Sequence, residues 1–535
     1  MKARRGRQGR QSRPVACLVA LALALAGCGG SSPGDPTAVS AGFAGGVAGD
    51  EPRAVLIAED VLAGGGNAAD AVVAYLMAAA VTYPAAASLG GGGLCVYYDV
   101  HANQVETLSF LPKAAGAAPP GGRATAVPGL VRGLHALNVR YGTMRFGALV
   151  APAESLARFG HPVSRAFARE VHLVGEPLRE DPGLRALVTR ADGSGLVREG
   201  DISIQLDLAA TLGQIRAKGS GEFYVGANAR RFADAVAAAG GAMSYEALRD
   251  YAVAWHPSAH TDVGYAVMHV PPPPESAAMG VLTLWRMLAD RDRYADASPQ
   301  LRPHLFAEAS VRALADRAAW PGLGTADAVL APARLDGLMA GYDPARKTPP
   351  QDLPTPPRAV AENPSAAGVA AVDHQGSAAS CIVTMNNLFG NGRVAPGTGV
   401  LLAAPPPATP PSLTPVIVVN PNSREVLFAG AASGGLGAQP ALVGTMLGAL
   451  EIGLPLREAI AQRRVVRLGN PDATVYESGL DAGIVEGMRQ RGHDMREVPE
   501  FGRVNAIYCP DGLRTSPESC SYATDPRGNG YAAGS

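Results

Sequence analysis

The hydrophobic pattern of this chain changes at one proline-rich segment, residues 347–364, and that change limits the folds available to it. Before the segment, apolar residues recur mostly at the helical period, with short β-like runs between them. The main helical stretches are 68–81, 129–141, 206–218 and 303–319, and the β-like runs are 93–100 and 266–270. The segment itself holds too many prolines for a helix or a central strand, so we expect a linker there.

After the linker, the pattern becomes that of β-hairpins. Two pairs of β-like runs flank short turns, and two helical patterns follow them. The paired runs are 369–373 with 378–384 and 415–420 with 425–430, and the helical patterns are 438–450 and 456–463. A helix-rich part, 50–346, completed by a hairpin-rich part, 365–535, predicts one layered α/β (α+β) domain.

Composition excludes several other classes of protein. Of the 535 residues, 47% are hydrophobic and 17% are charged, which does not fit a disordered chain, a collagen or a coiled coil. The formal net charge is −1, so no excess of positive charge is available to attract nucleic acid. We therefore expect no nucleic-acid partner, and the sequence leaves the oligomeric state open.

The N-terminus has the charge order of an export signal. Residues 1–13 carry six basic side chains and no acid, and the apolar run 14–27 is too short to span a bilayer, which takes about 20 residues. The run ends Leu25-Ala26-Gly27-Cys28, which resembles the bacterial lipobox. We predict a signal peptide at 1–27, lipid attachment at Cys28 and a flexible tether over 28–49. Ordinary secretion with an incidental cysteine is the alternative.

This leader also changes the charge balance and the expected location. Without residues 1–27 the net charge is −7. The mature chain is then a mildly acidic protein, anchored by lipid to the bacterial cell envelope and facing the periplasm or the exterior.

Four cysteines lie outside the leader. Cys509 and Cys520 are separated by ten residues rich in turn formers, which predicts a disulfide in an oxidising compartment. Cys95 and Cys381 lie in apolar, strand-like runs, and we expect both to be buried, unpaired thiols.

Common chemical motifs are weak in this sequence. His256 and His260 are four residues apart, but Pro257 breaks the helix that would align them, so no metal site is expected. The glycines 90–93 lack the Lys-Ser/Thr of a phosphate loop and indicate close backbone packing instead. Ser433 precedes two glycines but does not stand in a GxSxG elbow.

A collinear series of sequence blocks is more informative. Residues 65–71 read GGNAADA, Pro84 and 88–92 (SLGGG) follow, residues 127–133 read VPGLVRG, and residues 525–527 read DPR. From about residue 50 to the C-terminus, the series resembles the γ-glutamyltransferase (γ-glutamyltranspeptidase) family of N-terminal-nucleophile hydrolases.

The resemblance implies a fold and a chemistry. Family members form a four-layer αββα sandwich, made as a precursor that cuts itself in two. The cut exposes a threonine whose hydroxyl is the nucleophile and whose own α-amine is the base. No metal or organic cofactor is implied.

The nucleophile segment departs from the family pattern. Residues 366–368 read Ala-Ala-Gly where the family has Thr-Thr-His. The only nearby hydroxyl is Ser365, which we expect to need a β-bulge to reach the site because it is one residue early. Thr384 and Asn386 match the polar partners of the nucleophile, and Gly434 and Gly435 match the oxyanion hole.

The substrate-binding positions depart as well. Leu111 falls where the family has the arginine that clamps the substrate carboxylate, and an isobutyl group cannot form that bidentate pair. A serine pair maps to Pro411 and Ser412, so one hydroxyl is kept. The Asn-x-x-Asp stretch maps to 403–407, a run of alanine and proline.

Two functions remain on this evidence. In the first, the chain is a degenerate homologue that neither cuts itself nor transfers γ-glutamyl groups, and serves as an envelope binding or scaffold protein for a small peptide or amide. In the second, it is an active acyl transferase or amidohydrolase that uses Ser365 on a substrate unlike glutathione.

Overall fold

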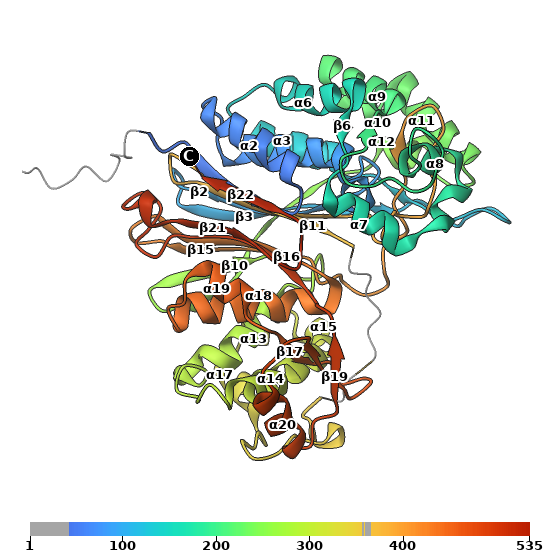
Figure 1. The fold of residues 1–535 in the computed structure, drawn as a ribbon. Helices are drawn as coiled ribbons and strands as arrows, with labels where there is room; N and C mark the ends of the chain where they lie inside the picture. Colours follow the sequence, from blue (N-terminus) through green and yellow to red (C-terminus); the bar gives the residue numbers. More distant parts are fainter. Residues whose placement is uncertain (1–41, 356–357, 359–364, 535) are drawn as a thin grey trace, which may run out of the picture. The chain divides into compact units, whose positions relative to one another are not determined.

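The computed structural model describes residues 42–355, 358 and 365–534, all within one compact unit, Val39–Ser535. Two antiparallel sheets form its centre, as Figure 1 shows. The first sheet has the order β22 (Tyr531–Gly534), β1 (Gly45–Gly49), β11 (Ala367–Asp373), β12 (Ala378–Thr384), β2 (Gly92–Asp99), β3 (Gln104–Phe110) and β8 (Ala254–Pro257). The second has the order β21 (Ser521–Thr524), β20 (Arg503–Tyr508), β16 (Glu425–Ser433), β15 (Thr414–Asn420), β10 (Ala266–Val270) and β9 (Ala259–Val263).

Helices cover the outer face of each sheet (Figure 1). Over the first sheet lie α2 (Pro52–Ala63), α3 (Ala68–Thr82), α5 (Leu130–Tyr141), α6 (Phe146–Phe159) and α9 (Leu206–Lys218). Over the second lie α13 (Met279–Ala289), α14 (Arg302–Asp316), α18 (Ala438–Met446) and α19 (Leu456–Ala461). The predicted four-layer αββα sandwich is confirmed, and the linker does not divide the chain into two domains.

Smaller elements complete the two helical layers. On the side of the first sheet these include α7 (Arg165–Val174), α8 (Pro182–Val188) and α11 (Gly226–Ala238). Beyond α14 lie α17 (Pro332–Met339), α20 (Ala482–Gln490) and a sheet of β17 (Val465–Arg467), β18 (Thr474–Glu477) and β19 (Met495–Val498).

The alanine-rich helix α3 shows how the layers fit together. A capping box starts it, since the Asn67 side chain accepts from the N–H of Asp70 while the Asp70 carboxylate accepts from the N–H of Asn67. All fifteen of its residues are buried, because it has other helices on one side and the strands β11 and β12 on the other. Small side chains allow this close approach on every face.

The glycine run 90–93 serves the close packing that the sequence predicts. A Cβ atom on Gly90 would lie 2.1 Å from the carbonyl oxygen of Leu401, and one on Gly92 would lie 2.1 Å from that of Phe110. A Cβ on Gly93 would lie 2.2 Å from the oxygen of Ile382. Any side chain at these positions would displace the neighbouring backbone.

Two predicted connecting segments include residues that are folded. The tether predicted over 28–49 overlaps β1, a fully buried strand that pairs with β11 on one side and β22 on the other. The predicted linker 347–364 starts inside the folded unit, where Arg312 donates to the buried Thr348 hydroxyl at 2.8 Å and a short 3₁₀ turn covers Pro350–Asp352. In both segments the structure depends on contacts with distant parts of the chain, which a local sequence pattern does not record.

The cysteines form two disulfides. Cys509 joins Cys520, as the spacing predicts. The expectation that Cys95 and Cys381 are unpaired is wrong, because they form a disulfide between β2 and β12. The two residues lie directly opposite each other in the ladder, a position that 286 residues of separation conceal in the sequence.

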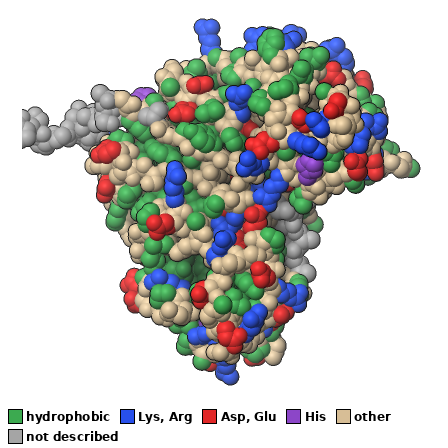
Figure 2. Space-filling model, in the orientation of Figure 1, with side chains coloured by type: hydrophobic (Ala, Val, Ile, Leu, Met, Phe, Trp, Pro, Cys, Tyr) green, Lys and Arg blue, Asp and Glu red, His purple; other side chains and the backbone are tan. Residues whose placement is uncertain are grey.

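The leader, including the signal peptide and Cys28, lies outside the described residues. Among the residues that are described, no helix has the length and apolar character needed to cross a membrane. On the face shown in Figure 2, acidic and basic side chains are interspersed.

Candidate active site

The predicted site residues meet at one end of the two central sheets. A cavity of about 660 Å³ opens where β11 and β15 begin and β12 and β16 end. Antiparallel pairing of β11 with β12, and of β15 with β16, brings these four strand ends together. The cavity is lined by Ser365, Thr384, Asn386, Ser412, Gly434 and Gly435.

Ser365 and Ala366 both line the cavity. Ser365 is 5% exposed, and its hydroxyl donates to the carbonyl of Ala85 at 3.4 Å. The pairing of β11 with β12 is regular from Ala367 onward, and Ser365 precedes that ladder. The strand starts after Ala366, and the alternation of faces does not yet apply at Ser365.

Thr384 and Asn386 form a chain of hydrogen bonds that ends at this segment. The Thr384 hydroxyl donates to the carbonyl of Ser365 at 2.9 Å, and the backbone N–H of Asn386 donates to the Thr384 oxygen at 2.9 Å. The Asn386 side chain donates to the carbonyl of Ala404 at 2.9 Å. These contacts fix the backbone around the position of the expected nucleophile.

The surroundings of Ala366 are apolar. Its methyl group belongs to a buried cluster with Leu94, Ile382 and Leu413, and Leu111 packs against the same cluster. Ala366 and Leu111, which are far apart in the sequence, therefore meet at the same apolar cluster, and only the fold shows this.

Gly434 and Gly435 connect β16 to α18 through conformations that favour glycine. Their φ angles are 117° and 60°, and a Cβ on Gly434 would lie 2.7 Å from the Cα of Gly502. The pair lines the cavity opposite the start of β11, where the family resemblance predicts the oxyanion hole.

The remaining walls carry no charge. Ser412 lies beside a proline wall made of Pro405, Pro407 and Pro411. Arg317 is not among the residues that line the cavity. Its guanidinium donates to the Ser412 hydroxyl at 3.0 Å and to the carbonyl of Pro410 at 2.9 Å. Of the described residues that line the cavity, none is acidic, basic or a histidine.

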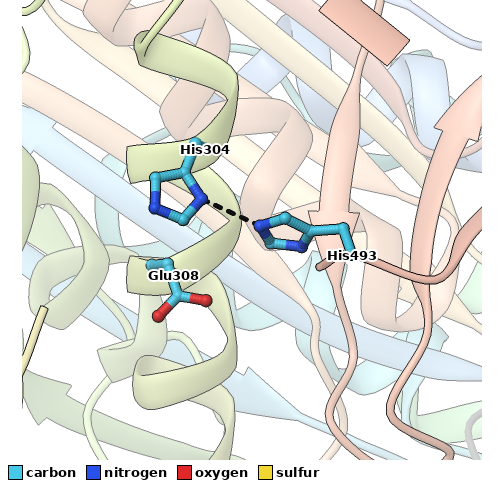
Figure 3. Close-up of side chains that lie close together, drawn as sticks. All are labelled: His304, Glu308 and His493. Carbon is cyan, nitrogen blue, oxygen red and sulfur yellow. Dashed lines mark hydrogen bonds between the residues drawn. The ribbon is translucent and has the colours of Figure 1, made fainter. Parts of the chain in front are cut away.

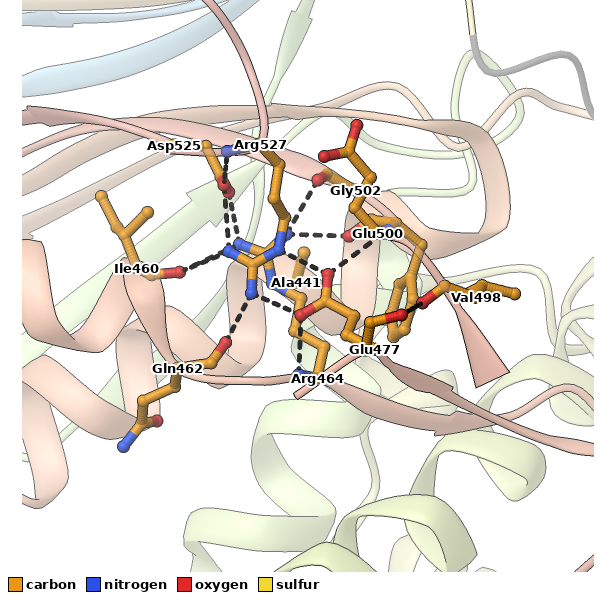
Figure 4. Close-up of polar contacts among 12 residues, drawn as sticks. Ala441, Ile460, Gln462, Arg464, Glu477, Val498, Glu500, Gly502, Asp525 and Arg527 are labelled. Carbon is orange, nitrogen blue, oxygen red and sulfur yellow. Dashed lines mark hydrogen bonds and ion pairs between the residues drawn. The ribbon is translucent and has the colours of Figure 1, made fainter. Parts of the chain in front are cut away.

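A buried ion-pair network joins Arg464, Glu477, Asp525 and Arg527 (Figure 4). It contacts Phe501, which lines the cavity. The Arg527 guanidinium pairs with both carboxylate oxygens of Glu477 and donates to Asp525 at 3.0 Å. Glu477 accepts from the N–H of Phe501 at 3.1 Å, and Arg464 donates to the carbonyl of Phe501 at 2.8 Å. The DPR block near the C-terminus thus fixes a segment that lines the cavity.

A second polar cluster, which the sequence does not indicate, lies away from this cavity. His304 and Glu308 on α14 meet His493 in the interior (Figure 3), with ligand atoms within 4.8 Å of one another. Such a cluster is a candidate for a metal, so its hydrogen-bond partners decide its role.

These partners favour a structural role for the cluster. His304 Nδ1 and His493 Nε2 are 2.8 Å apart, and the Glu308 carboxylate pairs with Arg312 at 2.8 Å and Arg467 at 2.7 Å. Burial, with the neighbouring positive charges of Arg467 and Lys347 and the ring of His304, lowers the pKa of His493 to about 3. A cation would have to displace two guanidinium groups from the only carboxylate of the cluster.

The comparisons with known proteins agree with the fold. A cephalosporin acylase from Bacillus halodurans superimposes with a TM-score of 0.73 at 19% identity, over 92% of this chain and 96% of that chain. The γ-glutamyltranspeptidase of Helicobacter pylori matches with a TM-score of 0.52 at 28% identity, over 60% and 97%. The layered sheets and the site at their end thus define an N-terminal-nucleophile hydrolase fold.

The sequence comparisons identify the family. The gamma-glutamyltranspeptidase model matches residues 54–535, and the chain belongs to that family. It is 27% identical to the glutathione hydrolase proenzyme of Bacillus subtilis (strain 168), over 88% of each chain. It is also 28% identical to the acylase ACY 1 proenzyme of Pseudomonas sp. (strain V22), over 87% of this chain and 90% of the relative.

Proposed function

We propose that this chain is a gamma-glutamyltranspeptidase homologue that neither cuts itself nor transfers γ-glutamyl groups, and that it binds a small neutral amide or peptide in the cavity. The observation that carries the proposal is the place of Ala366 in an apolar cluster with Leu94, Ile382 and Leu413, against which Leu111 packs. A methyl group has no oxygen with which to attack a carbonyl.

The absence of a base supports the same proposal. An N-terminal nucleophile takes its base from the α-amine that self-cleavage releases. Without that cut, a serine in the cavity needs a side-chain base, and no histidine, aspartate, glutamate or lysine is among the described residues that line it. The remaining hydroxyls and amides can bind a ligand but cannot deprotonate a nucleophile.

Whether the purified chain is intact or cut tests this proposal directly. The purified mature protein, run on a denaturing gel, should give a single band of full length. It should not release the aniline from a γ-glutamyl anilide. Two fragments with a new N-terminus between residues 364 and 367 would refute the proposal.

A second candidate function rests on Ser365. It lines the cavity next to Ala366 without any bulge, and its carbonyl accepts from Thr384. If the chain is cut before Ser365, the new amine and hydroxyl would hydrolyse neutral acyl amides. Cleavage and amidase activity that disappear in Ser365→Ala, but persist in Ser380→Ala outside the cavity, would establish this function instead.

We also propose that Cys28 carries the lipid that attaches the mature chain to the cell envelope. The lipobox-like residues and the basic start of the leader support this proposal. Expressed in a bacterial host with a radiolabelled fatty acid, the chain should incorporate label and fractionate with membranes. Cys28→Ser should abolish both, and an unlabelled, secreted wild-type chain would contradict the proposal.

A further inference from the structure

Ser433, to which the sequence analysis assigns no role, is the one cavity residue whose hydroxyl is buried with no partner among the described residues. It is the last residue of β16, it lines the cavity, and it is 2% exposed. Its Oγ has no hydrogen-bond partner in the described part of the chain. A buried hydroxyl without a partner costs free energy that a ligand can recover.

The direction of the Ser433 side chain follows from the alternation along β16. Ala429 packs in the cluster between the two sheets, and a Cβ on Gly368 of β11 would lie 2.9 Å from the Cβ of Ala431. Ala432, by contrast, packs in the cluster under α18. Since side chains on one face recur every second residue, Ser433 faces the first sheet, as Ala429 and Ala431 do. The cavity lies on that side, where β11 begins.

The walls around Ser433 limit the charge of a ligand. Apolar side chains form most of them, including Leu413, Leu436, Leu468 and Phe501. A carboxylate or ammonium group placed here would lose its hydration, with no opposite charge on the lining residues to replace it. The Thr384 hydroxyl and the Asn386 amide, which also line the cavity, suit a neutral ligand group that forms hydrogen bonds.

We propose that the cavity selects a neutral amide with an apolar acyl group, and that the Ser433 hydroxyl donates a hydrogen bond to the ligand's carbonyl oxygen. The next two residues, Gly434 and Gly435, line the same cavity. The apolar acyl group lies against the cluster of Ala366, Ile382 and Leu413. This inference rests on the proposed function, because it assigns the ligand class of the same non-catalytic cavity.

Two probes that differ only in the acyl group test the inference. Phenylacetyl-benzylamide is neutral, and γ-L-glutamyl-benzylamide carries the ammonium and carboxylate that the family clamp would bind. Isothermal titration calorimetry on the purified mature chain should show the neutral probe binding about tenfold more tightly or better. Ser433→Ala should weaken that binding by about fivefold while leaving thermal stability unchanged or higher.

Ser380→Ala is the matched control. The Ser380 hydroxyl is buried between the sheets, donates to the carbonyl of Gly430 at 2.7 Å and does not line the cavity. This variant should lose thermal stability and keep its affinity for the neutral probe. The opposite responses of the two serine variants separate a binding role from a structural one.

Three results would overturn the inference: equal or tighter binding of the γ-glutamyl probe, unchanged affinity in Ser433→Ala, or no binding of either probe up to its solubility limit. The denaturing-gel assay tests the proposed function separately. A self-cleaved chain that prefers the neutral probe refutes only the proposed function. An uncut chain that prefers the γ-glutamyl probe refutes only this inference.

Discussion

Replacing Arg527 by methionine tests whether the ion-pair network near the C-terminus stabilises the cavity wall. The Arg527 side chain is 4% exposed and that of Glu477 is 0% exposed, so both charges are fully removed from water. Arg527 also donates to the carbonyls of Ile460 at 2.9 Å and Gln462 at 2.7 Å. Arg527→Met keeps an unbranched apolar stem but removes every one of these donors.

The cost follows from what the substitution leaves behind. Glu477 keeps two backbone donors, the N–H groups of Arg464 and Phe501, but loses its bidentate partner. Removing one member of a buried pair costs about 3–5 kcal/mol, a large share of the 5–15 kcal/mol that stabilises an ordinary domain. Neutralising the stranded carboxylate in Arg527→Met/Glu477→Gln should recover part of that loss.

Urea denaturation measures the loss as a shift of the midpoint at a common slope. The control is Arg496→Met, whose partner Asp494 is also on the surface, with side chains 58% and 55% exposed. That variant should cost at most about 1 kcal/mol. A loss in Arg527→Met no larger than in Arg496→Met, or a double variant less stable than the single one, would refute the reasoning.

Three further predictions concern the site, the disulfide and pH. Ala366→Thr alone should not restore γ-glutamyl transfer, because Leu111 still provides no charge for the substrate carboxylate; measurable release from a γ-glutamyl anilide would contradict this. Cys95→Ser should destabilise the chain by about 2–4 kcal/mol in thermal or urea unfolding, because the disulfide to Cys381 closes a long loop, and peptide mapping without reductant should recover the Cys95–Cys381 pair from the wild type. Burial, with His260 nearby, lowers the pKa of His269 to about 4 from its usual 6.5. Because the unfolded chain binds a proton at His269 more readily than the folded chain, the contribution of the neutral imidazole to stability is fully present above pH 6.5. Below that pH, the free energy of unfolding falls toward pH 4 by about 1.4 kcal/mol per pH unit for this group. His269→Gln should flatten the pH dependence in that window, and an unchanged slope would exclude this origin.

Local patterns were sufficient for several elements of the fold. The predicted helix 206–218 is α9, and the predicted hairpin from 369–373 to 378–384 is β11 with β12. The predicted helix 438–450 is helical throughout, but α18 ends at Met446 and a π-helical turn follows it. These elements follow from contacts within a few residues, which a periodic pattern records directly.

Contacts between distant strands were beyond such patterns. The same apolar run that predicts a strand at Cys95 cannot show that Cys381 lies opposite it. His304 and His493 are hydrogen-bonded although 189 residues separate them. The direction of Ser433 likewise depends on which face of β16 meets the first sheet. Each of these pairings is a consequence of sheet order and register.

The sequence by itself determined the family resemblance and the layered α/β class, because each depends on the identity or spacing of neighbouring residues. The tertiary structure decided that Ala366 and Leu111 belong to one apolar cluster, that β1 is a buried strand, and that Ser433 lines the same uncharged cavity as Ser365. The physical reason is that antiparallel pairing and the stacking of two sheets bring four distant strand ends to one place. The chemistry of a cavity is the sum of the groups that meet there.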